Sequence, residues 1–188
     1  MKKIVFLLTI VSSFFVGAVY AQDASFGFKG GLNITSLGGD AEGVSFKPGA
    51  HAGFFARIDA SDNVIFQPEL IFSMQGANLD GDGGKVNYNY VNLPLMFKIY
   101  PGTAGFNVQM GPQVGFLVLG EFSDGDIAID IKEQLNAVDF ALGAGVGYDA
   151  GKVLLDFRYN YGLNSTAEDD TDGTFPNRTI QLSIGFLF

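Results

Sequence analysis

Seven charged residues occupy matching positions in segments of alternating polarity, and their types suit ion pairing better than catalysis. Each lies on a face that also carries glycines and amides, opposite a face of bulky apolar residues. Charges gathered in a narrow protein interior must pair or stay hydrated, because burying an unpaired charge is costly. We expect one inward-facing charge network made of Lys29, Arg57, Glu69, Lys98, Asp139, Asp156 and Arg158.

Two interpretations of this network remain open. In the first, crossed salt bridges form a structural plug. In the second, the pairs exchange partners and open a narrow water path. The sequence favours the plug, and a measurement of conductance separates the two.

The single histidine, His51, does not complete a catalytic group with its sequence neighbours. Acyl-transfer chemistry needs a Ser or Cys nucleophile beside the histidine and an acid that orients it. The chain has no cysteine, and Ser45 is near only in sequence. We predict that His51 is a polar residue of the interior and that the protein is not an enzyme, with no catalytic residue and no cofactor.

One loop has the carboxylate spacing of a calcium site. Residues 80–84 read Asp-Gly-Asp-Gly-Gly, but the third ligand and the distal glutamate of an EF-hand are missing. We predict no metal site there.

The segments that position these residues alternate with a period of two, which predicts β-strands with two unlike faces. We expect eight strands of about ten residues each. They cover approximately residues 26–34, 52–58, 66–74, 91–99, 106–116, 138–148, 153–161 and 180–188. The alternation shifts phase near residues 87–90, which predicts a β-bulge.

The connections between these strands alternate in length. Three are tight, at residues 60–63, 101–105 and 149–152, and four are longer, at residues 38–47, 77–87, 120–134 and 164–177. Short turns on one side and long loops on the other are typical of transmembrane β-barrels with an even number of strands.

The size of the apolar face decides between a membrane barrel and a two-sheet sandwich. An eight-stranded barrel has room inside only for small side chains and a few polar ones, so the bulky apolar face must point outward to lipid. A sandwich would instead expose a glycine-rich, poorly charged surface to water. We predict an all-β, eight-stranded antiparallel up-and-down transmembrane β-barrel. Tyrosines near the strand ends are expected at the membrane interfaces, namely Tyr88, Tyr90, Tyr100, Tyr148, Tyr159 and Tyr161.

The first 21 residues have the features of a cleavable export signal. Two lysines precede an apolar run that is short for a transmembrane helix, and small residues follow it. We predict cleavage after Ala21 and a barrel domain over residues 22–188. The absence of cysteine excludes disulfides and thiolate zinc sites.

The net charge of −9 makes a nucleic-acid partner improbable, because phosphate binding requires a basic face. Of the 20 acids, 13 lie in the four long loops, together with three lysines. We expect contacts with outer-membrane lipid, with lipopolysaccharide through bridging divalent cations, and with partner proteins through these loops.

Four motifs carry a resemblance to a known family. Residues 26–33 (FGFKGGLN), 67–73 (QPELIFS), 91–98 (VNLPLMFK) and 158–163 (RYNYGL) resemble successive strands of the PorT-like outer-membrane β-barrel family, common in the Bacteroidota. The resemblance covers residues 24–188. It implies the barrel fold and a location in the outer membrane of a Gram-negative bacterium, but little about activity. The terminal Phe188 resembles the signal read by the outer-membrane assembly machinery.

The favoured function is a small non-enzymatic barrel with a structural or loop-mediated binding role at the cell surface. The alternative is a narrow passive pore for small solutes. A membrane-embedded enzyme or a component associated with secretion is a weaker hypothesis.

Overall fold

The computed structural model describes residues 24–39, 41, 43–81, 84–102, 104–124, 127–167 and 174–188. The predicted export signal at residues 1–21 lies outside the described residues. Within the described part of the chain, no helix is long and apolar enough to cross a membrane.

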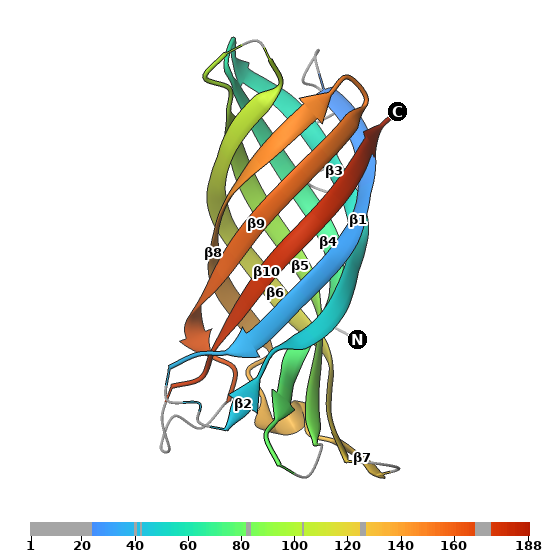
Figure 1. Cartoon of the computed structure of the whole chain (residues 1–188), viewed down its shortest axis with the longest axis vertical. Helices are drawn as coiled ribbons and strands as arrows, with labels where there is room; N and C mark the ends of the chain where they lie inside the picture. The colour runs from blue at the N-terminus through green and yellow to red at the C-terminus, as the bar shows by residue number, and fades with distance from the viewer. Residues whose placement is uncertain are drawn as a thin grey trace.

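Eight long strands form a closed antiparallel barrel, as predicted (Figure 1). Each strand pairs with its neighbour along the barrel, β1 pairs with β10, and the β4–β5 pairing completes the ring. The strands are β1 Ala24–Leu37, β3 Lys47–Ser61, β4 Val64–Leu79, β5 Lys85–Ile99, β6 Phe106–Asp124, β8 Val138–Ala150, β9 Val153–Ser165 and β10 Pro176–Leu187. Closure pairs the backbone groups between strands, which is the condition that hydrocarbon imposes on a β-protein.

The two ends of the barrel differ. The chain enters at β1 and leaves at β10 on one end, which also carries the tight turns after β3, β5 and β8; we call it the turn end (Figure 1). The opposite end, the loop end, carries three short elements: β2 Val44–Ser45, β7 Ile127–Asp130 and the 3₁₀ helix η1 Lys132–Gln134. There β2 pairs with β4, and β7 pairs with β6.

All four predicted long loops are partly strand, so the prediction was wrong at their edges, most of all in the loops at residues 77–87 and 120–134. β4 continues to Leu79 and β5 begins at Lys85, with Ala77 opposite Val86. β6 continues to Asp124. Beyond the membrane the strands need no apolar face, so ladder hydrogen bonding continues where the alternation of residue types has stopped.

A β-bulge is present at the predicted place in the β5–β6 pairing, but its extra residue lies on β6 and not within residues 87–90. The register between β5 and β6 shifts at Asn89 and Tyr90, which pair with Leu119 and Leu117, so that Val118 is the extra residue. Both Val118 and Leu119 are exposed. On β5, Tyr88 and Tyr90 face the interior and are buried.

The prediction of an interfacial position was therefore wrong for Tyr88 and Tyr90. The side chains of Tyr148, Tyr159 and Tyr161 are exposed on the outer face. That outer face is otherwise apolar, and Leu182, near the middle of β10, is 59 % exposed. An apolar belt of this kind is suited to lipid rather than to water.

We predict that Leu182→Lys lowers the free energy of unfolding in lipid bilayers by about 2–4 kcal/mol, because it places a charge near the middle of the lipid-facing belt. Reversible urea unfolding in vesicles measures this. The matched control is Ile127→Lys, an exposed apolar residue of the loop end, which we expect to leave stability unchanged. Equal costs at the two positions would contradict the assignment of the belt.

Candidate functional site

The centre of the barrel interior is built on a forked ion pair between β9 and β4. The Arg158 guanidinium donates from Nη1 to Glu69 Oε2 at 3.0 Å and from Nη2 to Glu69 Oε1 at 2.9 Å. Both side chains are almost fully buried. Two parallel charge-assisted hydrogen bonds fix orientation as well as charge.

Two lysines extend this pair across the lumen. Lys29 Nζ on β1 lies 3.2 Å from Glu69 Oε1 and 2.9 Å from Asp156 Oδ2 on β9. Lys98 Nζ on β5 lies 2.8 Å from Asp156 Oδ1. The amide of Gln109 on β6 donates to Asp156 at 2.9 Å and accepts from Arg158 at 2.8 Å. Side chains from five strands thus meet in one connected network.

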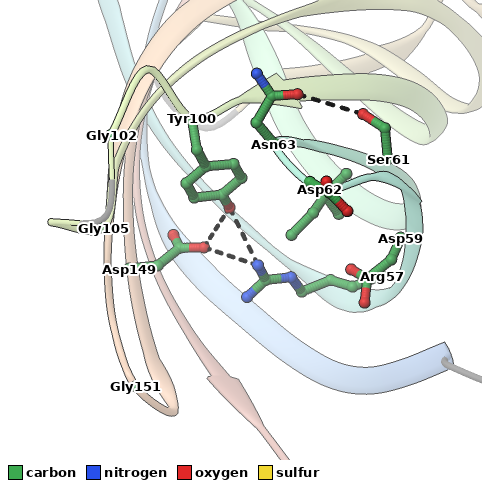
Figure 2. Close-up of a pocket in the computed structure, with 11 residues that line it drawn as sticks. Arg57, Asp59, Ser61, Asp62, Asn63, Tyr100, Gly102, Gly105, Asp149 and Gly151 are labelled. Carbon is green, nitrogen blue, oxygen red and sulfur yellow. Dashed lines mark hydrogen bonds and ion pairs between the residues drawn. The ribbon is translucent and has the colours of Figure 1, made fainter.

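The network continues to the turn end through Asp149 (Figure 2). Asp149 Oδ2 lies 3.1 Å from Arg57 Nη2 and accepts a 2.5 Å hydrogen bond from the Tyr100 hydroxyl, while Lys98 lies 3.7 Å from Asp149 Oδ1. The pKa of Tyr100 is raised, mainly because the hydroxyl is buried and secondly because it donates a hydrogen bond to Asp149. The hydroxyl therefore stays a donor. Arg57, Tyr100 and Asp149 line an open hollow of about 690 Å³.

The structure therefore brings together six of the seven charges expected to form the network and adds Asp149. We had expected Asp149 to begin a turn. The inward positions of β8 are the odd-numbered ones, and extending that alternation from Asp139 along the strand reaches Asp149. The signal was present, but the turn-forming sequence after it obscured the end of the strand.

Asp139 stands apart from the other six. It is the second residue of β8 at the loop end, whereas Asp149 is next to last at the turn end. Asp139 is 5 % exposed, and its Oδ1 atom has no hydrogen-bond partner within the described part of the chain. Charges on the inward face do not all meet, because the strand length separates them.

The loop half of the lumen is polar and contains His51. His51 Nδ1 lies 2.7 Å from Asn33 Oδ1, and Nε2 lies 2.8 Å from Ser183 Oγ. This order of serine, histidine and amide resembles a hydrolase triad. All three side chains are nearly fully buried, at 1–6 % exposure, so the arrangement supplies partners for buried polar groups. Sequence reasoning missed Ser183 and Asn33 because barrel closure alone brings β10 and β3 to either side of β1.

An apolar cluster covers the lumen at the loop end. Tyr88, Tyr90, Leu117 and Leu135 form this cluster, with Ile131 and others packed against it. η1 lies over it, and the Lys132 ammonium donates to the backbone carbonyl of Val118 at 2.8 Å. We call Tyr88, Tyr90, Leu117 and Leu135 the loop-end cap.

The loop end also carries acidic residues. Glu121, Asp124, Asp130 and Glu133 lie on β6, β7 and η1, and Asp80 follows β4. The other acids predicted for the loops, among them Asp82 of the calcium-like motif, lie outside the described residues. Within the described ranges, no group of three or more His, Cys, Asp or Glu side chains is placed to hold a metal ion.

We predict that Glu69→Gln destabilises the barrel by about 3–5 kcal/mol, because it leaves the Arg158 charge buried without its partner. The matched control is Asp139→Asn, which removes an unpaired carboxylate and costs no stability. Urea unfolding in detergent micelles compares the two. A cost for Asp139→Asn as large as that for Glu69→Gln would contradict this division of the lumen charges.

The comparisons with known proteins agree with this geometry. The family model described as "Outer membrane protein beta-barrel domain" matches residues 20–168. No protein among the curated sequences matches the chain.

Two solved structures show the same fold. Neisserial surface protein A is 13 % identical, with a TM-score of 0.56, and the match covers 88 % of this chain and 98 % of that one. Ail, the attachment invasion locus protein of Yersinia pestis, solved in complex with the heparin analogue sucrose octasulfate, is 13 % identical with a TM-score of 0.52, covering 89 % of this chain and 100 % of that one. With its family match and its closed eight-stranded barrel, the chain belongs to the outer membrane protein β-barrel domain family.

Proposed function

We propose that this protein is a non-conducting outer-membrane barrel that binds partners through its loop end. The observation that carries the proposal is the filled lumen. A chain of ion pairs runs from Arg57 to Glu69, and the loop-end cap covers the opposite end. A barrel filled in this way has its accessible chemistry at its ends rather than along a channel.

The proposal also assigns an orientation. The mature chain begins after Ala21 at the turn end, which faces the periplasm, and the loop end faces outward. The tight turns at one end and the protruding β2 and β6–β7 elements at the other support this assignment (Figure 1). Assembly through the terminal Phe188 and membership of a PorT-like group of the Bacteroidota belong to the same proposal and rest on the sequence motifs.

The charge of the loop end supports a cationic partner. Ail was crystallised with a sulfated ligand, but the long loops here hold 13 acids and three lysines. A polyanion would meet like charge, whereas a basic protein surface would meet its complement. Lipopolysaccharide would require bridging divalent cations.

A narrow pore is the second candidate. It is supported by the network itself, because Lys29 and Lys98 both approach Asp156. Exchange of these partners would open a water path. Catalysis is not proposed, since Ser183 lies inside the filled barrel at 6 % exposure.

We predict no discrete single-channel conductance for the refolded protein in planar lipid bilayers. Folding is checked first by the shift in gel mobility between unheated and heated samples. Regular conductance steps that change in Glu69→Gln would favour the pore and reject the closed barrel.

We predict binding of polylysine and no binding of heparin by the purified protein at low ionic strength, measured by surface plasmon resonance. The expected salt dependence is steep, because screening weakens contacts between exposed charges. Heparin binding as strong as polylysine binding would reject the assigned partner charge.

A further inference from the structure

The edge of β7 is the part of the loop end that is best placed to receive another chain. β7 pairs with β6 on one side, and within the described part of the chain it has no strand on the other. All four of its residues are exposed. Strand edges of this kind pair readily with an added strand, since their amides and carbonyls point outward unpaired.

The hydrogen-bond pattern identifies which backbone groups are free. The amide of Ile131 donates to the carbonyl of Gly120 at 3.0 Å, which continues the β6–β7 ladder by one pair. Bonding alternates along an antiparallel pair, so the Ile129 and Ile127 backbones also point to β6. The N–H and C=O groups of Ala128 and Asp130 therefore point away from the barrel.

The side chains define two chemically different faces along this edge. Ile127 and Ile129 share one face and are 61 % and 51 % exposed. On the other face, Asp130 lies directly opposite Glu121. Like charges directly opposite each other repel, so this face favours an added positive charge.

We infer that β7 binds an extended segment of a basic partner protein by strand addition. The segment carries apolar side chains toward Ile127 and Ile129 and Lys or Arg toward Asp130 and Glu121. The inference rests on the proposed function and specifies the kind of partner that the loop end would bind. A second copy of this chain fits less well, because it would bring an identical acidic edge against this one.

The test separates backbone pairing from charge attraction. The probe is an acetylated, amidated eight-residue peptide of alternating Lys and Val, with a Glu–Val peptide as the charge control. Ala128→Pro removes the outward amide donor and retains the bonds to β6, because proline is tolerated on the open side of an edge strand. Ala128→Val is the matched control and keeps the donor.

We expect the Lys–Val peptide to bind the full-length protein in detergent micelles and the Glu–Val peptide not to bind. Ala128→Pro is expected to weaken Lys–Val binding at least tenfold, and Ala128→Val to leave it unchanged, both measured by fluorescence anisotropy. Hydrogen exchange at the Ile129 and Ile131 amides shows whether the β6–β7 hairpin survives. Protection at both amides is expected in Ala128→Pro, whereas in Ile129→Pro, which has no amide hydrogen at position 129, protection at Ile131 is expected to be lost.

A shortened hairpin distinguishes failure of this inference from failure of the proposed function. Replacing residues 123–128 by Asn-Gly leaves Phe122 opposite Ile129 across a two-residue turn. If the shortened protein loses binding while Ala128→Pro binds like wild type, strand addition is refuted and loop-end binding stands. If the shortened protein binds the Lys–Val peptide as strongly as wild type does, the assigned occupant is refuted. It is also refuted if light scattering without peptide shows a dimer that Ala128→Pro converts to a monomer.

Discussion

Ring closure around a narrow lumen is the constraint on which the rest of this structure depends. In hydrocarbon, each backbone donor and acceptor must be paired within the protein, and a closed sheet achieves this without edges. Eight strands enclose only enough volume for side chains. The bulky apolar face must then point outward, and the polar face must fill the interior, where burying a charge without a partner is costly.

The lumen network follows from that requirement. Glu69 and Arg158 lie on β4 and β9, far apart in sequence, yet the narrow ring brings them to 2.9 Å. Replacing such pairs by apolar residues is often neutral for stability, so the network is better understood as a device that selects one arrangement of the strands. Its forked geometry is satisfied only when these strands face each other across the lumen.

The alternation of residue types predicted the strands, the barrel and six of the charges that meet in it. It failed where burial no longer distinguishes two faces. β6 continues beyond the predicted loop start to Asp124 because ladder bonds need no apolar partner. A bulge was predicted at residues 87–90, but the extra residue is Val118 on the neighbouring β6, and the inward position of Tyr88 and Tyr90 depends on which strand holds it. No period-two pattern contains that information. The contacts of His51 with Ser183 and Asn33 likewise required knowledge of which strands close the ring.

The same constraint explains why the open strand edge of β7 lies at the loop end. Closure removes sheet edges from the membrane-spanning part, so only strands that extend beyond the bilayer can present one. β6 does so, and β7 forms there as an outer strand with one side paired. Lumen cations such as Lys29 and Arg158 form ion pairs with buried acids. These cations are therefore not available as partners for the acids of the loops. A filled interior and an open strand edge at the loop end are therefore two consequences of one narrow ring.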